Sequence, residues 1–166
     1  MISFDLYFTG NVIEGLCIHP SLEYIIYPIV TNVVIQSIKS KEQYFIENEN
    51  PGEITAVACS NSGKYVAAGY LPYPGFKVIN SKFVISKHHI IIKLNIAFQA
   101  VINLWDFQSR QHLSSYDTHK DRVHSLKFSF CDNFILSVGG YGEDNNLICY
   151  SIEDKEIYCG IVFNTL

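Results

Sequence analysis

The feature of this sequence that most constrains its fold is a segment that recurs three times. The first two predicted strands of each copy align without gaps, at residues 15–27, 56–68 and 125–137. In each copy an alternating apolar stretch leads into a polar turn and then into a more continuous apolar stretch. Self-similarity of this kind indicates a repeat architecture, in which each unit packs against its neighbours.

Each copy reads as four short β-strands. The alternation at Leu16 and Ile18 predicts a first strand with one buried face. The second stretch, as at residues 24–27, is apolar at successive positions, which is typical of a strand covered on both faces. A third strand and a more polar fourth strand follow in each copy, at residues 33–38 and 42–46, 101–107 and 110–116, and 147–152 and 156–159.

Four short antiparallel strands per unit form the blade of a β-propeller. We therefore expect an all-β fold, a partial propeller of about three four-stranded antiparallel blades within a single domain. The blade-like units span about residues 11–47, 53–116 and 119–160. A ring needs at least about four blades to close, so we expect this chain to be an N-terminal fragment or a truncated gene product.

The second unit carries a surplus segment, which we expect to be an irregular insertion at residues 78–99. Val57 lies 48 residues before Trp105, whereas 20 and 24 residues separate the matching positions in the other units. The segment has no Asp, Glu, Gly or Pro, and residues of AT-rich codons fill more than half of it. These features favour the hypothesis that it is translated intron, and a genuine blade insertion, used for docking, is the alternative.

Composition narrows the functional classes. Apolar residues make up 48% of the 166 residues and charged residues 17%, which argues against disorder. The formal net charge of −4 disfavours nucleic acid as the main partner, because phosphate binding needs a basic face.

The odd number of cysteines and the lack of a C-x-x-C pair favour buried thiols in a reducing compartment. Because neither a signal peptide nor an apolar run of about 18 residues is present, we expect a cytosolic protein without a membrane span.

Motifs for catalysis or cofactor binding are weak. Residues 139–142 are rich in glycine but lack the following helix of a phosphate loop. His88 and His89 have no third metal ligand at a usable spacing. The sequence has no G-x-S-x-G nucleophile elbow, and Glu143 with Asp144 reads as a polar turn. We expect no enzyme activity, no cofactor, no metal and no small-molecule substrate.

The units resemble the WD-repeat family, whose blades contain a buried hydrogen-bonded tetrad of His, Ser, Trp and Asp. The resemblance implies that unit three supplies His119, Ser137 and Asp144, with Tyr150 in place of Trp. Unit two keeps the Trp105-Asp106 pair but has Ala67 and Ala68 where the Ser belongs. These tetrad-like residues, His119, Ser137, Asp144, Tyr150, Trp105 and Asp106, would have structural roles.

Six short sequence segments resemble, in order, the N-terminal blades of one kind of WD-repeat protein, found in motile cilia and flagella. They lie at residues 15–20, 24–28, 34–36 with 41–43, 62–69, 75–77 and 104–107. The resemblance implies a non-catalytic structural protein of the cytoplasm and the ciliary axoneme. It also implies that the partners are tubulin and other axonemal proteins, and that the protein stabilises doublet microtubules. The alternative is a general WD-repeat adaptor in a cytosolic or nuclear complex.

Overall fold

The computed structural model describes residues 12, 14–47, 52–72, 79–86, 89–96, 100–140 and 146–162. Within these ranges the chain consists of strands joined by turns, with no helix. Twelve of the strands form three four-stranded antiparallel sheets, which confirms the predicted all-β fold. Each of these sheets is called a blade below.

In each blade the strands lie side by side in chain order, apart from the insertion in blade two. Blade one contains β1 (Cys17–Ile18), β2 (Tyr24–Ile29), β3 (Asn32–Ser37) and β4 (Gln43–Ile46). Blade two contains β5 (Gly52–Cys59), β6 (Tyr65–Pro72), β9 (Ala100–Asp106) and β10 (His112–His119). Blade three contains β11 (Val123–Phe128), β12 (Phe134–Gly139), β13 (Asn146–Ser151) and β14 (Ile157–Val162).

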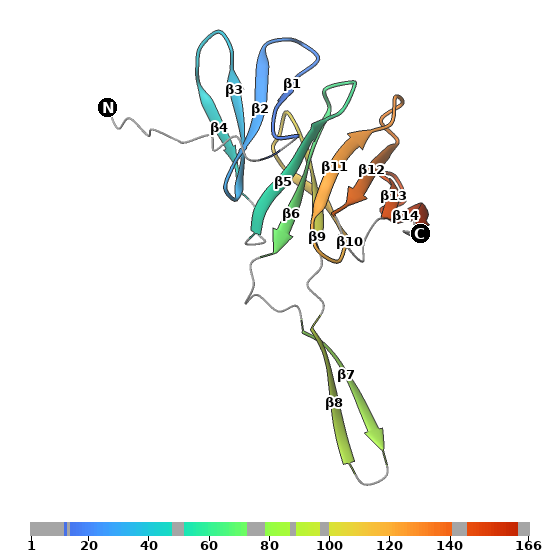
Figure 1. The fold of residues 1–166 in the computed structure, drawn as a ribbon. Helices are drawn as coiled ribbons and strands as arrows, with labels where there is room; N and C mark the ends of the chain where they lie inside the picture. Colours follow the sequence, from blue (N-terminus) through green and yellow to red (C-terminus); the bar gives the residue numbers. More distant parts are fainter. Residues whose placement is uncertain are drawn as a thin grey trace, which may run out of the picture.

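The three blades stand next to one another like the sectors of a fan (Figure 1). The first strand of each blade lies on the inside, because β5 contacts both β1 and β11. The fourth strands, β4, β10 and β14, form the outer edges of the blades. Blade two therefore has a neighbour on both faces, whereas blades one and three each have one face without a neighbouring blade.

The core lies between the blades, in two clusters that share blade two. The cluster between blades one and two includes Ile26, Ile35, Val57, Val66 and Trp105. The cluster between blades two and three includes Ala58, Ala67, Leu104, Leu126 and Tyr150. Successive residues of β6 alternate between these clusters, and residues 66–70 are all buried. The two-sided burial expected of the second strand is thus found in blade two.

The surplus segment of unit two forms a sheet of its own. Strands β7 (Ile79–Ser86) and β8 (His89–Ile96) pair only with each other and project away from the blades (Figure 1). The strands on either side of it pair directly, from Tyr65 with Asp106 to Tyr70 with Val101. The blade is therefore complete without the segment. We propose that residues 78–99 are translated intron, a hypothesis that sequencing of the spliced message tests directly.

Deleting residues 78–99 is expected to leave the free energy of unfolding unchanged to within about 1 kcal/mol. The reason is that residues 73–77 would still join β6 to β9, and a five-residue hairpin loop is of ordinary length. Chemical denaturation followed by tryptophan fluorescence measures the change, because Trp105 lies on β9. Deletion of residues 65–72, which form β6, is the control and should abolish folding. Loss of the cooperative transition on removing 78–99 would contradict this account.

Candidate functional site

Two of the tetrad-like residues meet inside the protein. His119, at the end of β10, and Ser137, on β12, are each 1% exposed. The His119 Nε2 atom lies 2.9 Å from the Ser137 Oγ atom. This hydrogen bond joins the last strand of blade two to the second strand of blade three. Asp144 lies outside the described residues, so the complete tetrad stays a prediction.

The aromatic members of the predicted set lie at blade junctions. Trp105, which is 2% exposed, faces blade one and has an edge-to-face contact with Tyr70. Tyr150, which is fully buried, faces blade two, with its ring centre 5.1 Å from that of Tyr116. These two residues hold the same register position in their blades. In blade one the position is occupied by Gln36, whose Oε1 atom accepts a hydrogen bond of 2.8 Å from the Tyr27 hydroxyl on the face without a neighbouring blade.

Asp106 caps a turn. We call the turn between the third and fourth strands of a blade its outer turn, at residues 38–42, 107–111 and 152–156. The Asp106 Oδ1 atom accepts hydrogen bonds of 2.8 Å from both the N–H and the hydroxyl of Ser109. These bonds lower the pKa of the Asp106 carboxyl below its ordinary value. Ser37 and Ser151 cap the other two outer turns in the same way.

A basic residue recurs in the left-handed conformation of every outer turn. Lys41, Arg110 and Lys155 have φ angles of 64°, 60° and 58°. Such angles are uncommon for residues other than glycine, so their recurrence indicates a shared turn geometry. The sequence carries a signal for it, since each basic residue follows the Gln36, Trp105 or Tyr150 position by five residues.

The basic residues of blades two and three each contact the preceding blade. The Arg110 guanidinium lies 4.0 Å from the centre of the Tyr44 ring on β4. The Lys155 Nζ atom donates a hydrogen bond of 3.3 Å to the Leu113 carbonyl on β10. Tyr44 and Leu113 are both the second residue of a fourth strand. We call this repeated contact the outer clasp.

The turns between the first and second strands, which we call inner turns, are also joined across the blades. Asp132 is in the left-handed conformation, with a φ angle of 59°. Its carboxylate accepts the N–H groups of Asn61 and Ser62 at 2.8 and 2.7 Å. Partial burial raises the pKa of this carboxyl, but the hydrogen bonds from Ser62 and Asn61 outweigh it and leave the pKa below its ordinary value. Asp132 therefore joins the inner turn of blade three to that of blade two.

The inner turns of blades one and two meet through His19. The His19 Nε2 atom lies 3.0 Å from the Gly63 carbonyl oxygen, and the ring stacks on Phe107 with centres 4.1 Å apart. Gly63 has a φ angle of 76°, and a Cβ atom there would lie 2.4 Å from the His19 Nε2 atom. Only glycine satisfies both the conformation and the close approach at this position.

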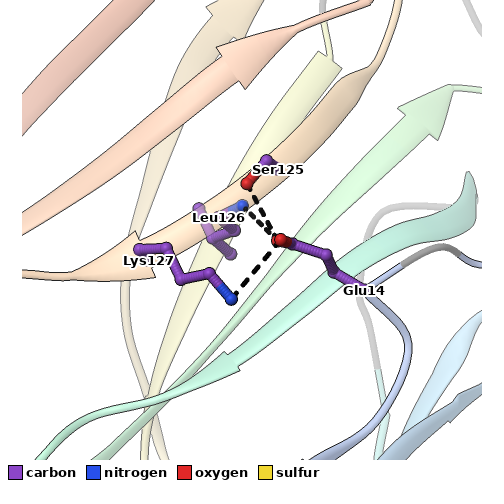
Figure 2. Close-up of polar contacts among 4 residues, drawn as sticks. All are labelled: Glu14, Ser125, Leu126 and Lys127. Atoms are coloured by element: carbon purple, nitrogen blue, oxygen red, sulfur yellow. Dashed lines mark hydrogen bonds and ion pairs between the residues drawn. The ribbon is translucent and has the colours of Figure 1, made fainter.

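Glu14 ties the chain before β1 to the inner strands (Figure 2). Its backbone carbonyl accepts the Val57 N–H of β5 at 3.1 Å. Its Oε2 atom accepts the Ser125 hydroxyl at 2.9 Å and the Leu126 N–H at 3.2 Å, both on β11. The Lys127 Nζ atom lies 3.4 Å from the Oε1 atom. Burial raises the Glu14 pKa, but the bonds from Ser125 and Leu126 and the charge of Lys127 outweigh it, so the pKa is lowered.

An open groove of about 470 Å³ lies between blades one and two. Both kinds of turn contribute to its walls, which include His19, Tyr44, Gly63, Asp106, Phe107 and Arg110. Aromatic rings next to charged groups are common on surfaces that bind other proteins.

Two cysteine side chains are partly buried between blades one and two, Cys17 on β1 and Cys59 on β5. Burial, with the nearby Cys59, raises the pKa of Cys17 to about 12, and burial raises that of Cys59 to about 12. Both thiols are therefore protonated at neutral pH and poor nucleophiles. Among the described residues no group of three His, Cys, Asp or Glu side chains could hold a metal ion. The same part of the chain has no helix of the length and apolarity needed to cross a bilayer.

Comparison with protein families identifies the repeat. The model of the WD domain, G-beta repeat, matches residues 110–151, from the outer turn of blade two to the end of β13. This part of the chain contains a WD repeat, from the family that the sequence resembles. The predicted resemblance is thereby confirmed, and the junction contacts above are contacts between WD blades.

The chain is similar in sequence to proteins that share one name in several organisms. Cilia- and flagella-associated protein 52 of Homo sapiens is 33% identical over 153 residues, which cover 92% of this chain and 21% of that protein. The Chlamydomonas reinhardtii protein of the same name is 29% identical over 159 residues, which cover 95% of this chain and 22% of that protein. This WD-repeat chain thus spans about a fifth of the length of these relatives.

Solved structures support the fold. The structure of U3-55K matches with a TM-score of 0.64 at 20% identity, covering 94% of this chain and 41% of that chain. A chain of the mitotic checkpoint complex has the same TM-score at 12% identity, covering 90% of this chain and 38% of that chain. At these identities the likeness concerns the WD-repeat fold alone.

The Glu14→Gln variant is expected to lose about 1 kcal/mol of unfolding free energy at pH 7. The folded pKa of Glu14 lies below its ordinary value of 4.5, so the ionised carboxylate stabilises the protein above that pH. This contribution is lost as the pH falls through the folded pKa, and the two proteins should then converge. Urea denaturation from pH 7 down to pH 3 measures the difference.

The matched control is Glu53→Gln, an exposed carboxylate on β5. It is expected to change the unfolding free energy by less than about 0.5 kcal/mol at any pH. A loss in Glu14→Gln that stays constant over the whole pH range would contradict a role for the Glu14 charge.

Proposed function

We propose that this chain is a non-catalytic structural WD-repeat protein of motile cilia and flagella. In this proposal it stabilises the doublet microtubules of the axoneme by binding tubulin and other axonemal proteins. The observation that carries the proposal is the 33% identity, over 92% of the chain, with cilia- and flagella-associated protein 52 of Homo sapiens. A relative of the same name in Chlamydomonas reinhardtii supports the same location.

The chemistry of the blades supports a binding role. The described His–Ser pair, His119 with Ser137, is buried and joins two strands, so no substrate can reach it. Asp106 and Asp132 use their carboxylates to cap or join turns. What the molecule presents outward is a rim of turns and the groove beside Arg110, surfaces on which a partner protein can dock.

The proposal predicts that the tagged chain, expressed in a ciliated cell, remains with the axoneme after detergent and salt extraction. Sedimentation of the purified chain with microtubules of pure tubulin then separates tubulin binding from binding to other axonemal proteins. The control is Tyr150→Asp, which buries a charge at the junction of blades two and three and should abolish axonemal retention by preventing folding. A diffuse cytosolic or nuclear pool of the unaltered chain, excluded from cilia, would contradict the proposal and favour the adaptor alternative.

A further inference from the structure

The groove between blades one and two is shaped by a change at one position of the inner turn. In blade three the left-handed position of this turn is Asp132, whose carboxylate reaches across the junction to the N–H groups of Asn61 and Ser62. In blade two the same position is Gly63, which has no side chain, and the His19 ring lies against its backbone. Gly63 lines the groove, so the groove is open at the place where an aspartate ties the next two blades together.

Two cationic side chains line this groove, Lys64 next to Gly63 in the inner turn and Arg110 in the outer turn of blade two. Both are exposed, and each lies over a tyrosine ring, Arg110 at 4.0 Å from the centre of Tyr44 and Lys64 at 4.9 Å from the centre of Tyr65. Within the part of the chain that the structure describes, neither cation forms an ion pair with a carboxylate. Most of their N–H groups are therefore available to an acceptor on another molecule.

The carboxylates near the groove are engaged by donors of their own turns. Asp106, which lines the groove, accepts hydrogen bonds from the N–H and the hydroxyl of Ser109. Glu42, next to the groove-lining Tyr44, accepts the hydroxyls of Ser40 and Tyr44 at 3.1 and 3.3 Å. The groove thus combines cations that have donors to spare with anions whose acceptors are partly in use. A ligand that brings acceptors and negative charge complements this arrangement.

The wall between these charges is aromatic. The His19 ring stacks on Phe107, and Phe107 meets Tyr24 edge to face with ring centres 5.5 Å apart. These three rings line the groove together with Tyr44. The groove volume of about 470 Å³ lies within the range of pockets that bind small ligands, about 300–1,000 Å³, so it can take a few residues of a peptide. An apolar side chain between acidic ones matches rings that lie between cations.

We propose that this groove binds a short acidic segment of a partner protein, with one carboxylate on Arg110, another on Lys64 and an apolar side chain against the rings between them. This inference deepens the proposed function and rests on its binding role, because it names the chemistry of the partner segment. Arg110 is the stronger determinant, since a planar guanidinium can hold a carboxylate through two N–H groups while it lies on the Tyr44 ring. Nucleic acid also brings negative charge, but the net charge of −4 disfavours it as the occupant.

Fluorescence anisotropy of a labelled peptide, Gly-Glu-Glu-Leu-Glu-Glu-Gly, titrated with the full chain tests the proposal. We expect saturable binding that weakens as the salt concentration rises, because exposed charge pairs are screened. The same peptide with Lys in place of every Glu should not bind. An oligothymidylate of the same length, which has the charge but no apolar side chain, should bind at least about tenfold more weakly.

Charge reversal at the two cations locates the site. Arg110→Glu and Lys64→Glu should each weaken peptide binding about tenfold or more, because each places a like charge beside the ligand. The matched control is Lys155→Glu, at the same turn position as Arg110 but in blade three. It removes an outer clasp and reverses one charge, as Arg110→Glu does, and should leave peptide binding unchanged. Loss of a clasp therefore cannot account for a loss of binding that is confined to Arg110→Glu.

The proposal is overturned if the unaltered chain does not bind the acidic peptide, binds the oligonucleotide as tightly, or loses as much affinity in Lys155→Glu as in Arg110→Glu. Axonemal retention of the unaltered chain, measured in parallel, separates this inference from the proposed function. Retention without peptide binding would overturn the acidic-segment site alone. Peptide binding without retention would overturn the ciliary role and support the site.

Discussion

The whole structure depends on one constraint, namely that a four-stranded blade buries most of its apolar side chains against another blade. The two core clusters lie between blades, and blade two contributes to both. Each large apolar side chain that becomes buried there contributes about 1.5–3 kcal/mol, so the junctions supply most of the apolar stabilisation. A single blade has no such cluster, and its backbone hydrogen bonds alone would leave it marginal.

The main polar contacts also lie between neighbouring blades. His119 with Ser137, Asp132 with Asn61, and His19 with Gly63 each join a residue of one blade to a residue of the next. Glu14 does so across two blades at once. Because these pairs set how one sheet stands against the next, they also set the shape of the rim and of the groove between blades one and two. The surface available to a partner is thus a consequence of the junctions.

The repeat predicted the fold well, because alternation and turn residues are local signals that a single sequence displays. It also placed the surplus segment correctly between two strands that pair directly in the structure. The junction contacts were harder to foresee, because they require knowing which blades are neighbours. Asp132 reads in the sequence as an ordinary turn residue, and Glu14 lies just before the part of unit one that aligns with the other units. The fixed spacing of Lys41, Arg110 and Lys155 is a signal of the outer clasps that the sequence displays. The sequence alone does not show which strand such a basic residue contacts.

The most direct test of this account is native-state hydrogen exchange, measured strand by strand across a range of denaturant. If the junctions hold the fold together, the amides of β6 and β12 should exchange through one shared opening with the same free energy, because loss of their common cluster uncovers one face of each strand. The account would be contradicted if blade three lost its protection at a much lower free energy while blade two kept its full protection. Blades with independent stabilities would show that each sheet folds on its own.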